Sequence, residues 1–244
     1  MFSKNSKNLI KKINYKDIII VFGTWYFIAI FNFLIGEVNI KYTPNLSGFL
    51  HFSFIFTGRF LFLGLIIFYF ISIHSVTFSE LGLSFFKLKK QIHLTIYFLS
   101  FFLIIILLFI NIPLSFNSLS DKFHPLFKIN SPGNFVKSII PLLLLFIPNM
   151  VIALSEQFIL NNIVFELFNL KINTIISVIL SSLFYSIIVF TFSPSQILIN
   201  CIIALISIYL YLKANRSLYL PTFIMSIYYS LYIGYIYGWG YLKF

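Results

Sequence analysis

The residues that could do chemistry gather in one hydrophobic stretch, from Pro148 to Phe168. This stretch contains two acids, Glu156 and Glu166, and the side-chain amides at positions 157, 161 and 162 lie close to them in sequence. Placing an ionised side chain in hydrocarbon costs at least about 2.5 kcal/mol. A membrane sequence that keeps such a residue has a partner or a use for it, so Glu156 is the first candidate for a functional residue.

Two interpretations of Glu156 are open. A carboxylate at this position could act as a general base that activates water. It could equally be structural, either near a membrane interface or paired with Arg59, which lies inside another hydrophobic segment. A buried arginine–carboxylate pair satisfies both groups. For Glu166, which lies close to Lys171, the sequence favours an interfacial position.

The composition excludes a soluble globular protein. Of the 244 residues, 60% are hydrophobic and only 9% are charged, and the mean hydropathy is +0.99. A soluble domain carries roughly 25% charged residues. The apolar runs have the length of membrane-spanning helices, about 20 residues each. We therefore expect an all-α, polytopic transmembrane bundle of about seven helices.

The hydrophobic pattern predicts where these helices lie. The expected spans cover residues 17–36, 47–73, 92–116, 137–168, 172–192, 195–212 and 218–238. The fourth is too long for one untilted span and contains Pro141 and Pro148, which predict a kink or a break. Residues 74–91 include a segment typical of a short amphipathic helix on the membrane surface, and residues 117–136 read as a loop. We divide the chain into an N-terminal part, 1–136, and a core, 137–244, within one integral membrane domain.

The charge pattern indicates membrane topology. The net charge is +11, but the basic residues lie between hydrophobic segments, as topology signals do. The sequence therefore predicts a lipid bilayer as partner, no nucleic acid, and a cytoplasmic N-terminus. The lone Cys201 excludes an intrachain disulfide, and the histidines lack the spacing of a metal motif. No metal or cofactor is predicted.

Three further polar residues lie in the last two expected spans. Asn200, Ser226 and Ser230 are predicted to form hydrogen bonds between helices. Ser226 and Ser230 are four residues apart and so share one helix face.

The last hundred residues resemble the CPBP family, also called Abi or CAAX-protease-like proteins. The first family motif is E-E-x-x-x-R, and the matching stretch here is S-E-Q-F-I-L-N, residues 155–161. Glu156 matches the second acid of the motif. Ser155 stands in place of the first acid and Leu160 in place of the arginine.

Two later family motifs also have counterparts in this chain. The motif F-x-x-x-H, about thirty residues on, is matched by F-Y-S-I-I, in which Phe184 is kept and Ile188 replaces the histidine. The motif H-x-x-x-N or H-x-x-x-D follows a matching S-L-x-x-P phrase. Here Ser226 takes the histidine position and Ser230 the Asn or Asp position.

The resemblance implies an intramembrane protease scaffold of the bacterial plasma membrane. In the family, the glutamate activates water while the histidines and the Asn or Asp orient and polarise. Ile188 cannot fill such a role and Ser226 is a weak substitute, and constellations of this kind act as a unit. We therefore expect a degenerate pseudoprotease that acts as a membrane scaffold or regulator by binding another membrane protein or a peptide.

Two rival functions stay open at this point. The first is an active intramembrane endopeptidase that uses Glu156 with substitute partners such as His51 or His93. The second is a transporter or channel component in which Glu156 and Arg59 line a polar path. Transporters often show paired repeats with broken helices, and the sequence has one irregular region of this kind.

Overall fold

A computed structural model describes residues 5–42, 47–83, 93, 146–188 and 194–236. These residues are helical or in turns, with no strand among them, which confirms the all-α prediction. The elements are α1 (Asn5–Lys12), α2 (Tyr15–Tyr42), α3 (Ser47–His74), the π-helical segment η1 (Phe158–Phe165), α7 (Glu166–Lys171), α8 (Thr174–Ile188), α9 (Pro194–Lys213) and α10 (Tyr219–Ile236). The segments η1 and α7 belong to one continuous helix, Phe146–Lys171, which we call the Glu156 helix.

Two of the described helices are long and apolar enough to cross a membrane. They are Ser53–His74, within α3, and the Glu156 helix. This finding suggests membrane association. The helices expected within residues 17–36, 172–192, 195–212 and 218–238 match α2, α8, α9 and α10. The span expected at 92–116 and the loop at 117–136 lie outside the described residues, apart from position 93.

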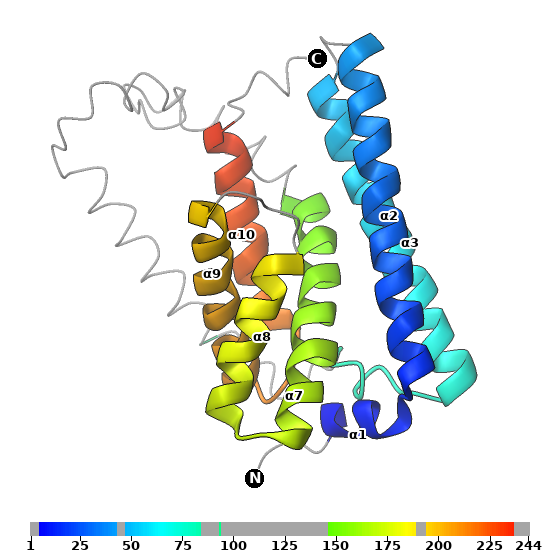
Figure 1. Ribbon diagram of the computed structural model, residues 1–244, viewed down its shortest axis with the longest axis vertical. Coiled ribbons are helices and arrows are strands. Elements are labelled where there is room, and N and C mark those ends of the chain that lie inside the picture. The colour runs from blue at the N-terminus through cyan, green and yellow to red at the C-terminus, as the bar shows by residue number, and fades with distance from the viewer. Residues whose placement is uncertain (1–4, 43–46, 84–92, 94–145, 189–193, 237–244) are drawn as a thin grey trace, which may run out of the picture.

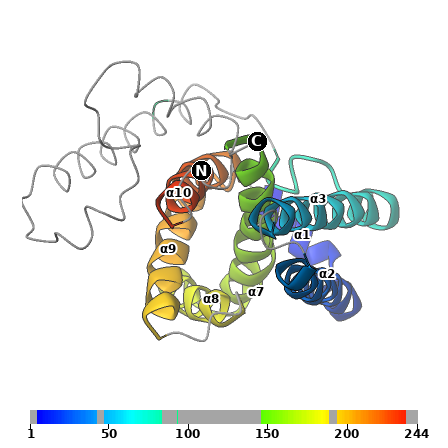
Figure 2. The same ribbon diagram turned by 90° about the horizontal axis from the view of Figure 1, so that it is seen from above.

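The helices form an arc with a pair set beside it. Figure 2 shows the Glu156 helix, α8, α9 and α10 following one another around the arc, with α3 next to the Glu156 helix and α2 beyond. In Figure 1, α2 and α3 run in opposite directions, and α1 lies across one end of the molecule. The end of α3, the end of α7 and the start of α8 lie at this same end. We call it the α1 end.

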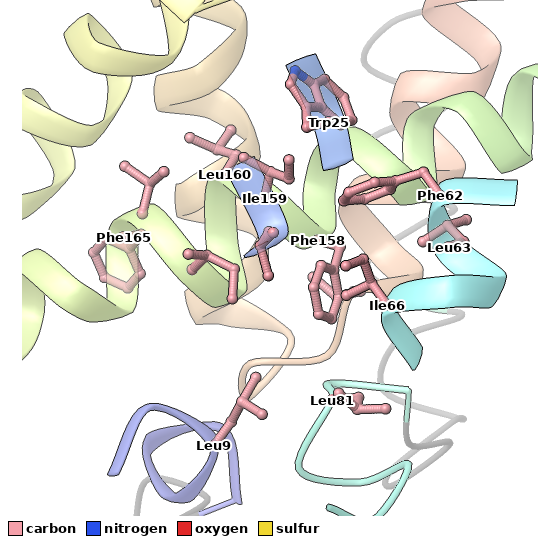
Figure 3. Packing of buried hydrophobic residues seen from close by; sticks show 14 of the residues in the cluster. Leu9, Trp25, Phe62, Leu63, Ile66, Leu81, Phe158, Ile159, Leu160 and Phe165 are labelled. Carbon is pink, nitrogen blue, oxygen red and sulfur yellow. The ribbon is translucent and has the colours of Figure 1, made fainter. Parts of the chain in front are cut away.

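One hydrophobic core joins α1, α2 and α3 to the Glu156 helix and α9. Trp25 and Phe62 pack edge to face, with ring centroids 5.2 Å apart. Phe158, at the start of η1, lies 6.2 Å from the ring of Phe70. Leu9 of α1 is fully buried and closes the core at the α1 end (Figure 3). The hairpin of α2 and α3 is thus held to the Glu156 helix by side-chain packing.

The predicted break at Pro148 is wrong. The Glu156 helix continues through Pro148 and Asn149 without interruption, while Pro141 lies outside the described residues. Proline is tolerated in the first turn of a helix, and Pro148 is the third residue of the described part of this one. The irregularity of this helix is η1, which begins ten residues after Pro148. A π-helical segment is rare and is frequent at functional sites.

The predicted amphipathic helix between α3 and the next span is also wrong in its described part. Residues 78–82 form turns, and residues 84–92 lie outside the description. An amphipathic helix among the described residues is α1, in which Leu9 and Ile10 are buried, whereas Lys11 and Lys12 are exposed. Gly82 adopts a left-handed φ of 70°, a conformation in which an α-helix does not continue.

The turn after α3 is fastened by Glu80. Its Oε2 accepts hydrogen bonds from the Thr77 N–H (2.9 Å) and from Lys12 Nζ (3.0 Å). Burial raises the pKa of Glu80, but these hydrogen bonds outweigh it and hold the pKa below its usual value. A lowered pKa keeps the carboxylate charged at neutral pH, so the link between α1 and the turn persists.

Gly82 joins this turn to the other half of the molecule. Its carbonyl accepts a hydrogen bond from the N–H of Leu218 at 2.9 Å. The preceding carbonyl, of Leu81, accepts one from Asn162 Nδ2 at 2.7 Å. The turn therefore contacts both the Glu156 helix and the segment that connects α9 to α10.

We predict that Gly82→Ala lowers the thermal midpoint of the protein in detergent. A left-handed φ costs an L-residue about 1–2 kcal/mol, and the new Cβ would lie 3.1 Å from Leu218 Cγ and 3.2 Å from the Arg216 carbonyl oxygen. Gly64→Ala is the matched control, since nothing lies within 4 Å of its Cβ position. Equal midpoints for the two variants would contradict the prediction.

Candidate functional site

Glu156 lies where three helices meet. It is 7% exposed and stands two residues before η1. Its Oε2 accepts a hydrogen bond from the hydroxyl of Tyr185 on α8, at 2.9 Å, and another from the hydroxyl of Tyr229 on α10. Hydrogen bonds to an ionised group are roughly twice as strong as neutral ones. The carboxylate thus ties the Glu156 helix to α8 and α10.

Arg59 of α3 adds a positive charge to this centre without direct contact. It lies within electrostatic range of Glu156 and of both tyrosines. Its guanidinium carbon is 3.4 Å from the ring centroid of Trp25, a cation–π contact. No ion pair between Arg59 and Glu156 occurs in the described part of the chain. Arg59 and Glu156, which the sequence pairs, therefore interact through their charges without an ion-pair contact. The described contact of the Arg59 guanidinium is with Trp25.

The residues at the first family motif are structural. Ser155 is fully buried and donates a hydrogen bond to the carbonyl of Ile152 at 2.7 Å. Leu160 is fully buried in the hydrophobic core. Among the described residues, neither side chain has a hydrogen bond to the Glu156 carboxylate, which accepts from the two tyrosines. Ser155 and Leu160 therefore make backbone and packing contacts.

The second family motif falls on α8. Phe184 is 43% exposed, and its ring packs edge to face against Phe22 and Phe168. Ile188 is the last residue of α8, and its side chain lies outside the description. The residue of this helix that reaches Glu156 is Tyr185, directly after Phe184.

The third family motif falls on α10, and its two serines are both buried. Ser226 donates to the carbonyl of Thr222 in its own helix, at 2.7 Å. Ser230 donates to the carbonyl of Ser226 and accepts a hydrogen bond from Asn149 Nδ2 at 3.0 Å. The predicted interhelical hydrogen bond is confirmed for Ser230, and the described bond of Ser226 is within the helix.

No histidine contacts Glu156 among the described side chains. His74 lies near the α1 end, where its Nε2 is 3.0 Å from Asp17. His93 is exposed to solvent. The side chain of His51 lies outside the description, as does His124.

A set of polar side chains after Glu156 faces α9. Asn161 Nδ2 donates to Gln157 Oε1 at 2.7 Å and to Ser207 Oγ at 3.3 Å, and Ser207 in turn donates to Gln157. One turn along α9, the hydroxyl of Tyr211 lies 3.0 Å from Asn162 Oδ1. All five side chains are at most 1% exposed. They form a dry hydrogen-bonded contact between the two helices.

Glu166, which the sequence places at a membrane interface, is buried inside the protein with a charged partner. Its side chain is fully buried, and its Oε2 lies 3.2 Å from Nη1 of Arg216, which follows α9. Its Oε1 lies 3.2 Å from the hydroxyl of Tyr211. Arg216 adopts a left-handed φ of 64°, a conformation that costs energy for a non-glycine residue. The buried ion pair holds the segment after α9 in that conformation.

The tyrosines at this centre were missed by sequence reasoning. Tyr185, Tyr211 and Tyr229 all contact an acid of the Glu156 helix. The chain contains 15 tyrosines and 33 phenylalanines, so aromatic residues carried no weight as a signal. The available signal was position, because Tyr229 stands between Ser226 and Ser230 on a helix already singled out.

Chemically, the Glu156 centre holds a negative charge in place. Two phenol donors meet one carboxylate oxygen, and a guanidinium lies nearby to balance the charge. A general base must reach the water that it activates, and a developing oxyanion needs donors of its own. The two hydroxyls closest to Glu156 already donate to the carboxylate. The arrangement therefore resembles a fixed polar contact more than a reaction centre.

Comparisons with known proteins supply no relative for this chain. No family model, curated protein or solved structure matches it. The role of Glu156 is therefore inferred from the side chains around it.

We predict that Tyr185→Phe and Tyr229→Phe each destabilise the protein by about 1.5–3 kcal/mol, the range for a hydrogen bond to a charged group. The measurement is the free energy of unfolding in mixed micelles. Tyr209→Phe is the control, because Tyr209 is 50% exposed and loses only a surface hydroxyl. If both variants match this control, the tyrosines do not stabilise the carboxylate.

We predict that Arg216→Met destabilises the protein by about 3–5 kcal/mol, because it leaves the Glu166 charge buried without its cation. The double variant Arg216→Met, Glu166→Leu should recover a large part of this loss, since no lone charge remains. A double-mutant cycle on unfolding free energies measures the coupling. Additive effects would show that the ion pair is not an energetic unit.

Proposed function

We propose that this chain is a polytopic membrane protein on a CPBP-like scaffold without peptidase activity. It acts as a membrane scaffold or regulator that binds another membrane protein or a peptide. Its N-terminus lies on the cytoplasmic side of a bacterial plasma membrane. The observation that carries the proposal is the set of groups around Glu156. They are two phenol hydroxyls and a nearby guanidinium, and no described histidine is in contact.

The hydroxyls at the substituted family positions support the loss of chemistry. Ser226 and Ser230 both donate to backbone carbonyls of α10, and Ser155 donates to a carbonyl of its own helix. A serine that donates to a carbonyl of its own helix cannot at the same time donate to a substrate oxyanion. Glu156 therefore lacks the neighbouring groups that would donate and accept protons alongside it in a peptidase.

The packing of the polar residues favours a scaffold over a transporter or channel component. Asn161, Asn162 and Glu166 are fully buried, and each has a partner on a neighbouring helix or segment. A conducting path needs polar groups that water or a substrate can reach. Dry interhelical hydrogen bonds are the arrangement expected of structural contacts in a membrane bundle.

An active endopeptidase is the second candidate. The observation in its favour is that Glu156 keeps 7% exposure beside two phenols, which could donate to a substrate if they left the carboxylate. The same experiment separates the two candidates.

The test is a cleavage assay with purified protein in proteoliposomes, using a panel of membrane-associated and prenylated peptides. The wild-type protein is compared with Glu156→Gln and with empty liposomes. We expect the three product yields to agree, because the side chains that would assist Glu156 in a peptidase are missing. Tyr209→Phe serves as a matched control for effects of purification. Turnover that depends on Glu156 would overturn the proposal in favour of the endopeptidase.

A further inference from the structure

We infer that the α1 end of the molecule binds the headgroups of anionic phospholipids. The inference rests on the proposed membrane location. It adds the chemical class of lipid headgroup that this end of the protein contacts. The main observation is an imbalance of charge at this end. Its described lysines are exposed, whereas its described acids are buried or paired with other groups of the protein.

The lysines come from four separate elements that meet at this end (Figure 1). Lys11 lies on α1, Lys16 in the first turn of α2, Lys171 at the end of α7 and Lys213 at the end of α9. All four side chains are exposed. Because the fold places them at one end, their charges act together on an anionic surface, although they are far apart in sequence.

The described acids at the same end do not cancel this charge, because each one is buried or paired inside the protein. Asp17 is 2% exposed and accepts hydrogen bonds from the Asn14 N–H and the Tyr69 hydroxyl. Glu80 pairs with Lys12, and Glu166 pairs with Arg216. The charge that remains at the surface is positive.

The helix α1 is built to present its lysines outward. Leu9 and Ile10 are buried, and α1 packs against η1 and α7. Lys11 and Lys12 lie on the opposite, exposed side. The apolar face of α1 thus packs against the protein. Its polar face is exposed and can contact lipid headgroups and water.

Two exposed tyrosines place this end at the depth of the headgroups. Tyr15 is 69% exposed and precedes Lys16 directly. Tyr209 is 50% exposed, and the Lys213 ammonium lies 5.4 Å from its ring centroid. Tyrosine is enriched at membrane–water interfaces, and lysine extends from there towards the headgroups.

The experiment is lipid binding measured by native mass spectrometry on the whole protein in detergent. Short-chain phosphatidylglycerol and phosphatidylcholine with the same acyl chains are titrated at low salt and at about 1 M salt, where the Debye length falls to about 3 Å. We expect tighter binding of phosphatidylglycerol at low salt and loss of this preference at high salt. Inorganic phosphate at equal concentration should not displace the lipid.

The variant with Lys11, Lys16, Lys171 and Lys213 all changed to Gln should lose the preference, by up to about fivefold per lysine. The matched variant with Arg at the same four positions should keep it. Equal binding of the two lipids at low salt, an unchanged preference in the Gln variant, or displacement by phosphate would each overturn the inference. The salt comparison uses the wild-type protein, so it stands even if the Gln variant does not fold.

The outcome is separate from that of the proposed function. Equal binding of the two lipids by a protein that reconstitutes into the proteoliposomes of the cleavage assay contradicts only the lipid inference. A protein that does not reconstitute into those proteoliposomes contradicts the membrane location itself. Cleavage dependent on Glu156 would remove the pseudoprotease proposal and leave the lipid result untouched.

Discussion

The structure depends on satisfying the polar side chains of one helix. In an α-helix of about 3.6 residues per turn, Gln157 and Glu166 would be separated by about two and a half turns and would face opposite sides. The wider turn of η1, with its i→i+5 hydrogen bonding, covers the same nine residues in about two turns. Both side chains can then face α9, where Ser207 and Tyr211 stand four residues apart.

The π-helical segment thus explains why these polar residues are tolerated. Gln157 and Asn161 meet Ser207, and Asn162 and Glu166 meet Tyr211. A regular helix would turn part of this set towards the apolar core, where an unpaired polar group costs several kcal/mol. The π-helical segment η1 and the buried amides therefore act together. They fix the register between the Glu156 helix and α9.

The sequence predicted the helices well and the partners of the acids poorly. Apolar runs of membrane length locate α2, α3, α8, α9 and α10, because hydrophobic length is a local property of the chain. The turn at Gly82 and the amphipathic α1 were missed, since Gly82 takes its left-handed φ in a turn that hydrogen bonds join to distant residues. The hydrogen-bond partners of Glu156 come from two other helices, and no local pattern encodes such a meeting.

The two acids of the Glu156 helix show how position decides the role of a buried charge. Glu166 meets Arg216 directly, so its charge is neutralised by an ion pair at the α1 end. The described hydrogen bonds of Glu156 come from two neutral hydroxyls, and Arg59, whose charge acts on it, is held on the ring of Trp25. A carboxylate held in this way keeps its place through hydrogen bonds while the positive charge is fixed to another helix pair. Moving α3 relative to the arc would separate that charge from Glu156, so the electrostatics of this centre favour one position of the α2–α3 hairpin against the Glu156 helix.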